Sequence, residues 1–307
     1  MTRSIAVTFP SEGTELRAIL HLPHGPTAAG TAPGVVVTGS WTTVKEQMAG
    51  RYARRLAEEG FATLAFDFRG YGESAGHPRD VESPAMKAAD IHAAVTFLAG
   101  HPDVDGDRLG ALGVCASAGY TAVNAAGDAR VRSIALVAPW LHDTDLVRGL
   151  YGGADGVAAR IAAGARARRR FTETGEVDYV DAVATAAADD PGASAAMVGP
   201  FDSPPWDYYT NPGRGAIPQW SNRFAVMQWE EWLTFDPIAV APSITQPVLL
   251  VHSEDAAVPE GAEAFASGLG GEHRFVWTDG VQLDFYDQQA QVTGAVREVA
   301  GHLRATL

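Results

Sequence analysis

The chain has 307 residues, of which 23 are basic and 37 acidic, so its formal net charge is −14. Apolar residues make up 46% and charged residues 20%, a balance typical of a folded globular protein and not of a disordered one. The acidic excess argues against nucleic-acid partners, because binding phosphates requires clustered Lys and Arg. The one cysteine, Cys115, excludes an internal disulfide and cannot by itself form a thiolate zinc site.

The N-terminal segment Met1–Pro10 lacks the apolar region of a secretory signal. No run reaches the roughly 18 apolar residues of a membrane helix. We therefore expect a cytoplasmic protein with no membrane partner.

Short apolar runs alternate with helical patterns along most of the chain. The expected strands are 4–9, 16–22, 34–38, 61–67, 109–114, 131–138, 247–251 and 273–277, and the expected helices are 44–59, 83–99, 116–126, 259–269 and 289–303. This alternation predicts an α/β protein whose mostly parallel sheet has helices on both faces. The first two strands should form an antiparallel hairpin at one edge.

Residues 140–235 break this alternation. They contain no convincing strand, and four of the seven tryptophans lie between Trp206 and Trp232. We expect a core formed by residues 1–139 and 236–307, with residues 140–235 inserted as a helical cap.

The segment Gly113-Val114-Cys115-Ala116-Ser117 joins a buried strand directly to a helix, which is the setting of a nucleophile elbow. Small residues are needed two positions before and after the nucleophile, and Gly113 and Ser117 satisfy this for Cys115. A second frame, centred on Ser117, requires two small residues to extend the strand, so the pattern favours Cys115. The competing interpretation is that Cys115 is a small buried core residue.

With the elbow, four further segments resemble the α/β-hydrolase superfamily, most closely the dienelactone hydrolases and acylaminoacyl peptidases. They are VVVTGSWTTVKEQMA (35–49), FDFRGYGES (66–74), PVLLVHSEDAAVP (247–259) and GVQLDFYD (280–287). The resemblance implies an α/β-hydrolase fold with Cys115 as nucleophile. It also implies an oxyanion hole formed by the backbone N–H of Ala116 and that of Ser40 or Trp41.

The resemblance places the acid of a catalytic triad at Asp255, with Glu254 as the alternative. Where the family has its catalytic histidine, this chain has Gln282, which cannot act as a general base. His252 and His142 are candidate replacements for this base, although lone histidines are more often structural.

The expected substrate-binding residues are Ser117, His142, Trp206, Tyr208 and Trp229. The aromatic residues Trp206, Tyr208 and Trp229 could instead pack between the cap and the core. A basic cluster is formed by Arg166, Arg168, Arg169 and Arg170. We interpret it as a solvated helix face and not as a binding site for a phosphate-bearing acyl carrier. Residues 70–75 match G-x-G-x-x-A, but a loop follows where a dinucleotide site needs a helix. We expect no cofactor and no metal.

Three functions remain open from the sequence. The first is an enzyme acting on an ester, thioester or lactone, such as a secondary metabolite, through Cys115. The second, suggested by Gln282, is a non-hydrolytic acyltransferase or cyclase at the same site. The third is a small-molecule binding protein on a hydrolase scaffold. The expected partner is a small acyl substrate, free or carrier-bound, and a homodimer is left open as the assembly.

Overall fold

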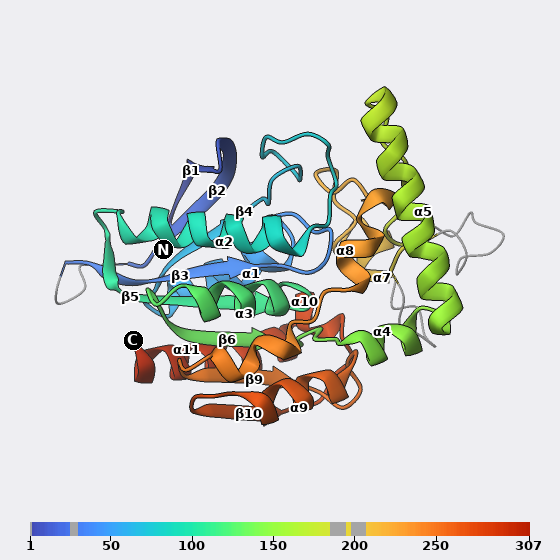
Figure 1. Ribbon diagram of the computed structural model, residues 1–307. Helices are drawn as coiled ribbons and strands as arrows, with labels where there is room; N and C mark the ends of the chain where they lie inside the picture. The colour runs from blue at the N-terminus through green and yellow to red at the C-terminus, as the bar shows by residue number, and fades with distance from the viewer. Residues whose placement is uncertain (1, 25–29, 185–194, 198–206) are drawn as a thin grey trace.

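The computed structural model describes residues 2–24, 30–184, 195–197 and 207–307. Within them, eight strands form one sheet in the order β1-β2-β4-β3-β5-β6-β9-β10 (Figure 1). Their bounds are β1 Arg3–Ser11, β2 Thr14–Leu22, β3 Ala32–Thr38, β4 Ala62–Phe66, β5 Val104–Val114, β6 Val131–Val137, β9 Val248–His252 and β10 His273–Trp277.

Strands β3 to β6, β9 and β10 run parallel, and the hairpin β1–β2 lies antiparallel at one edge. The central strands β3 and β4 are buried along almost their whole length, as expected for a parallel sheet covered on both faces. Because these strands are parallel, the loops that follow β3, β5 and β10 meet at the same edge of the sheet. The candidate site lies at this edge.

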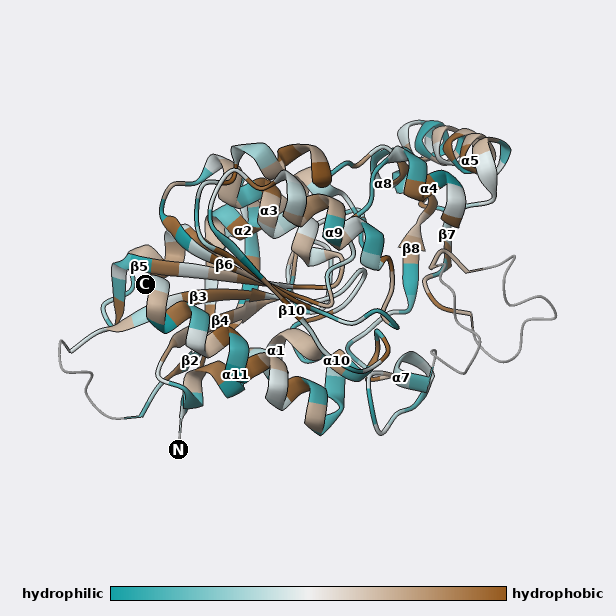
Figure 2. Ribbon diagram, turned by 90° about the horizontal axis from the view of Figure 1, so that it is seen from below, coloured by the Kyte–Doolittle hydropathy of each residue, from teal (hydrophilic) through white to brown (hydrophobic). Residues whose placement is uncertain are grey.

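Helices cover both faces of the sheet (Figure 2). Helices α2, α3 and α9 lie on one face, and α1 and α11 lie on the other. Their bounds, with that of the short helix α10, are α1 Met48–Glu58, α2 Pro84–Ala99, α3 Ser117–Gly127, α9 Pro259–Gly268, α10 Asp284–Asp287 and α11 Gln289–Thr306. Helix α2 begins where the sequence predicts, because Ser83 Oγ accepts from the Met86 N–H and Pro84 occupies the first turn.

The elements between β6 and β9 gather at one end of the sheet, beyond the ends of the parallel strands (Figures 1 and 2). They are α4 Thr144–Leu150, α5 Gly153–Thr174, β7 Tyr179–Asp181, α7 Asp207–Thr210, β8 Arg223–Ala225, a 3₁₀ turn at Val226–Gln228 and α8 Trp229–Leu233, whereas the second 3₁₀ turn, Ile238–Ser243, packs against α3 and α9. Strands β7 and β8 pair antiparallel, so the prediction of a strand-free segment is wrong. Three-residue strands are too short to show a period in the sequence.

Aromatic rings join these elements to the loop after β3. Phe224 of β8 stacks on Trp41, with the two ring centroids 4.8 Å apart, and Trp232 of α8 contacts the same ring at 5.1 Å. In the described part of the chain, no helix is both long enough and apolar enough to cross a membrane.

Candidate active site

Cys115 occupies the turn between β5 and α3. Its φ is 56°, in the left-handed region that a non-glycine residue seldom adopts, whereas Ser117 is already the first residue of the helix. A Cβ at Gly113 would lie 2.6 Å from the Ser117 carbonyl oxygen, so no larger residue fits two positions before the turn. The strained position of the elbow is therefore Cys115.

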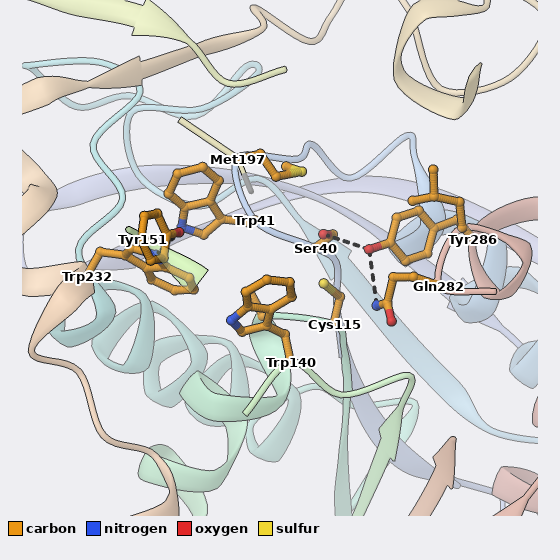
Figure 3. Close-up of a pocket in the computed structure, with 11 residues that line it drawn as sticks. Ser40, Trp41, Cys115, Trp140, Tyr151, Met197, Trp232, Gln282 and Tyr286 are labelled. Atoms are coloured by element: carbon orange, nitrogen blue, oxygen red, sulfur yellow. Dashed lines mark hydrogen bonds between the residues drawn. The ribbon is translucent and has the colours of Figure 1, made fainter. Parts of the chain in front are cut away.

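The alternative nucleophile, Ser117, does not line the cavity beside Cys115. Ser117 is fully buried, and its Oγ has no hydrogen-bond partner. Cys115 instead lines a small cavity at the edge of the sheet, while Ser117 is not among the described residues that line it. The lining residues are Ser40, Trp41, Cys115, Ala116, Trp140, Tyr151, Met197, Trp232, Gln282, Leu283 and Tyr286 (Figure 3).

The cavity has a polar side and an aromatic side. Figure 3 shows Ser40, Tyr286 and Gln282 on one side of Cys115, and Trp41, Tyr151 and Trp232 on the other. Among these aromatic residues, the Trp232 indole N–H donates to the Tyr151 hydroxyl at 2.8 Å. The aromatic side offers an apolar surface to an organic group held beside the thiol.

Gln282 holds the loop after β10 with both ends of its amide. Its Nε2 donates to the Ala138 carbonyl at 2.9 Å, and its Oε1 accepts from the Ala257 N–H at 3.1 Å. Asp255, the expected acid, is exposed, and its own backbone N–H donates to Ser253 Oγ. The structure therefore does not bring Asp255 to Gln282, because the Ala257 N–H occupies the amide oxygen that faces that loop.

The two candidate replacement histidines are neutral and lie outside the cavity lining. Burial lowers the pKa of His142 to about 4, and its ring accepts from the Trp140 indole N–H at Nδ1 and contacts the Trp232 carbonyl at Nε2. Burial also lowers the pKa of His252 to about 4, and neither of its ring nitrogens has a hydrogen-bond partner. Neither side chain faces Cys115 as a general base.

Burial raises the pKa of the Cys115 thiol. Hydrogen bonds from Ser40, Tyr286, the Ala116 N–H and Gln282 act in the opposite direction. The Ala116 N–H lies at the start of α3, where the helix dipole also favours negative charge. The thiol is thus neutral at rest, among donors that can stabilise its anion.

The second expected oxyanion donor lies in the loop 39–47 after β3. The Ser40 N–H donates to the sulfur of Met48 at 3.4 Å, whereas Trp41 lines the cavity. The next residue, Thr42, has a φ of 59°, and its N–H donates to Glu82 at 3.0 Å. Glu82 therefore fixes the backbone beside Trp41.

Glu82 is fully buried and carries a network of its own. Its carboxylate accepts from Lys87 Nζ at 2.6 and 2.7 Å, from the Tyr120 hydroxyl at 2.7 Å and from the Tyr71 hydroxyl at 2.9 Å. Lys87 Nζ also lies 4.6 Å from the centroid of the Tyr71 ring. The charge of Glu82 is thus balanced inside the protein.

The other expected substrate-binding residues are not in the cavity lining. Tyr208 packs edge-on against the ring of Tyr286 in α10, whereas Trp229 packs against Phe224 of β8, within the same inserted segment. Trp206 lies outside the described residues. The exposed arginines of α5 are partly neutralised, since Arg170 pairs with Glu176 and Asp178.

Sequence reasoning missed Tyr286, whose signal was present. It follows Gln282 by four residues, and the turn at Gln282 leads directly into α10, so the two side chains lie on the same side of the cavity. Trp140, Tyr151, Met197 and Leu283 could not be found this way, because their positions depend on how cap and core pack.

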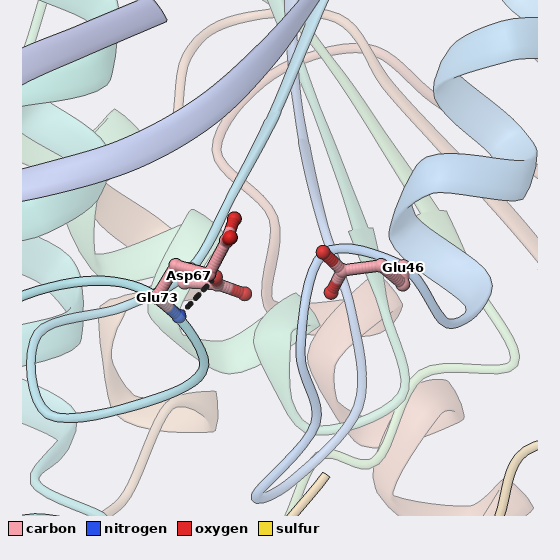
Figure 4. Close-up of side chains that lie close together, drawn as sticks. All are labelled: Glu46, Asp67 and Glu73. Atoms are coloured by element: carbon pink, nitrogen blue, oxygen red, sulfur yellow. Dashed lines mark hydrogen bonds between the residues drawn. The ribbon is translucent and has the colours of Figure 1, made fainter. Parts of the chain in front are cut away.

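Three carboxylates, Glu46, Asp67 and Glu73, also lie close together (Figure 4). Their oxygens surround Lys45 Nζ at 2.7, 2.8 and 2.7 Å, so the lysine already supplies the positive charge. The residues thus form a salt-bridge network beneath the loop 39–47, and the cluster does not resemble a metal site.

Comparison with known proteins places these features in one family. The model of the alpha/beta hydrolase family matches residues 22–296. YcjY of Escherichia coli (strain K12), an uncharacterized protein, is 28% identical over the full length of both chains. The crystal structure of the hypothetical protein PA2218 from Pseudomonas aeruginosa has a TM-score of 0.83 at 27% identity, covering 100% of this chain and 94% of that one. The predicted fold is confirmed.

Two fungal relatives have more informative names. Thiohydrolase aneE of Aspergillus aculeatus is 37% identical over 134 residues, which cover 43% of this chain and 40% of that protein. Polyketide transferase grgF of a Penicillium species is 29% identical over 117 residues, covering 38% of this chain and 40% of that protein. The crystal structure of GrgF has a TM-score of 0.81 at 20% identity and covers 99% of both chains.

Proposed function

Because the chain belongs to the alpha/beta hydrolase family, we propose that it is an acyl-transfer enzyme. Cys115 takes an acyl group from a thioester and passes it to an acceptor other than water. The observation that carries this proposal is the thiol at the strained elbow, beside a cavity whose described lining contains no histidine and no carboxylate.

The reaction begins when Cys115 Sγ attacks the thioester carbonyl. The negative charge that develops on the carbonyl oxygen is stabilised by the Ala116 N–H and the Trp41 N–H. The Ser40 N–H is not assigned to this role, because it already donates to Met48. The apolar rings of Trp140 and Trp232 pack against the acyl chain.

A thioester suits this site better than an ester or lactone. Exchange of an acyl group between two thiols forms one C–S bond, breaks another and moves one proton, so no ionised base is required at the end of the step. An ester must expel a more basic alkoxide, and a water molecule needs deprotonation before it attacks an acyl-cysteine. The relative grgF is named a polyketide transferase, which agrees with group transfer, whereas aneE is named a thiohydrolase.

The test uses a medium-chain acyl N-acetylcysteamine thioester. The wild type should release thiol in a burst and gain the mass of one acyl group on Cys115, and Cys115→Ala should do neither. An added amine or thiol acceptor should accelerate turnover well beyond the rate in water. Full activity of Cys115→Ala contradicts the proposal, and loss of the adduct in Ser117→Ala alone moves the nucleophile to the second frame.

A binding protein without catalysis is the alternative that burial of Cys115 favours, because burial raises the pKa of the thiol. It predicts no acyl adduct from any activated thioester, together with saturable binding of the intact substrate. The same mass spectra therefore distinguish the two functions.

A further inference from the structure

Three buried hydroxyl groups lie in a chain beside Cys115. Ser40 Oγ is 3.2 Å from the Tyr286 hydroxyl and accepts from the Tyr209 hydroxyl at 3.2 Å. Gln282 Nε2 donates to the Tyr286 oxygen at 3.4 Å, and Figure 3 shows these groups facing the thiol side of the cavity. All four side chains are buried, so each proton in the chain needs a partner within the protein.

The direction of the hydrogen bonds follows from Gln282. Its oxygen must accept from the Ala257 N–H, so its NH₂ group faces the Ala138 carbonyl and Tyr286. The Tyr286 oxygen therefore accepts a hydrogen bond from the amide, and its own O–H is free to donate one. Ser40, which accepts from Tyr209, is likewise free to donate.

The receivers available to these two protons are each other's oxygen and Cys115 Sγ, which lines the same small cavity as Ser40 and Tyr286. The titratable groups that face the thiol are tyrosines, namely Tyr209, Tyr286 and Tyr120 of α3. Burial holds the pKa of Tyr286 and that of Tyr209 well above the ordinary value, so these hydroxyls stay neutral and pass a proton on without keeping the charge.

We infer that Tyr286 and Ser40 form a hydroxyl relay that replaces the missing histidine. As Sγ bonds to the acyl carbon, the relay takes the thiol proton and delivers one to the departing thiolate, so the leaving group departs as a neutral thiol. Both residues line the cavity beside the reacting sulfur and, in this inference, exchange the proton with it directly, as catalytic residues. Tyr209 and Gln282 act through them and are positioning residues.

This inference rests on the proposed function, but one of its tests does not. Alkylation of Cys115 by iodoacetamide needs no acyl substrate and follows the thiolate fraction at each pH. Removing a donor to the thiolate in Tyr286→Phe or Ser40→Ala should raise the pH at half-maximal alkylation by about one unit, which is about tenfold in rate below that pH. Acylation by the thioester should fall at least tenfold in both variants.

The matched control is Tyr52→Phe. Tyr52 is fully buried on α1 and donates to the carbonyl of Phe285, next to Tyr286, but it is not among the described residues that line the cavity. This variant loses one buried hydroxyl bond, as Tyr286→Phe does, and should keep the wild-type pH profile. If Tyr286→Phe does not fold, Ser40→Ala decides through the same two measurements.

The outcomes separate the two proposals. A wild-type protein that is alkylated but never acylated overturns the proposed function, whereas acylated wild type shows that the nucleophile is correct. Wild-type acylation and an unchanged alkylation profile in Tyr286→Phe and Ser40→Ala overturn the relay. Gln282→Leu should give a smaller shift in the same direction, since it only loosens Tyr286.

Discussion

Replacing Glu82 with glutamine should destabilise the protein by leaving the Lys87 ammonium buried without a counter-charge. Glu82 and Lys87 are fully buried, and the two hydrogen bonds between them are 2.6 and 2.7 Å long. Removing one partner of such a pair typically lowers the free energy of unfolding by about 3–5 kcal/mol, because the remaining charge is left buried without water or a counter-charge to stabilise it. We expect Glu82→Gln to lower the free energy of unfolding by that amount.

The double variant Glu82→Gln/Lys87→Met supplies the control. It removes both charges and keeps an oxygen that accepts from the Thr42 N–H, which donates to Glu82 at 3.0 Å in the wild type. Replacing a whole buried pair by uncharged groups is often close to neutral. The double variant should therefore lose much less stability than the sum of the single variants, with a coupling energy of at least about 2 kcal/mol.

Urea unfolding at constant pH measures the free energy of unfolding of the wild type, Glu82→Gln, Lys87→Met and the double variant, provided that the m-value stays constant. A loss below about 1 kcal/mol in Glu82→Gln, or additive losses in the double variant, would refute a buried charge pair behind the loop 39–47. The thioester assay adds a functional readout, because Glu82 holds the backbone next to Trp41. Acylation should therefore fall further in Glu82→Ala, which has no acceptor for the Thr42 N–H, than in Glu82→Gln.

Three other variants or conditions test separate parts of the structure. The pKa of His142 and that of His252 are about 4 in the folded protein, against about 6.5 in the unfolded chain, so the unfolded chain binds protons first as the pH falls. The free energy of unfolding should therefore fall by about 2 kcal/mol per histidine between pH 7.5 and pH 5. Urea unfolding of His252→Phe should lack the share of this loss that comes from His252. Gln282→His should raise hydrolysis of p-nitrophenyl acetate by supplying a base, and an unchanged rate would mean that residue 282 is not placed as the family's histidine is. Gly113→Ala should lower the melting temperature by several degrees, because its Cβ meets the Ser117 carbonyl oxygen at 2.6 Å, and an unchanged value contradicts the tight elbow.

The sequence was most informative where local backbone chemistry decides the outcome. The apolar runs of the central strands and the Gly113–Ser117 elbow both reflect constraints within a few residues, and both were found. Asp255 was assigned from its position after a strand, but its distance from Gln282 depends on how the two loops close. The Ala257 N–H, which no sequence pattern indicates, takes the amide oxygen instead. The short pair β7–β8 and the aromatic lining depend on packing between distant segments in the same way.

Cysteine at position 115 and glutamine at position 282 both suit a reaction that needs no strong general base. A serine nucleophile needs a base strong enough to remove an alcohol proton, and Gln282 cannot supply one. A thiol attacking a thioester begins and ends with one neutral thiol, so it needs only donors and acceptors that move a proton over a short distance. Gln282, held at both ends by backbone groups, contributes an N–H that orients Tyr286. Under the proposed function, Gln282 therefore suits thioester exchange better than hydrolysis.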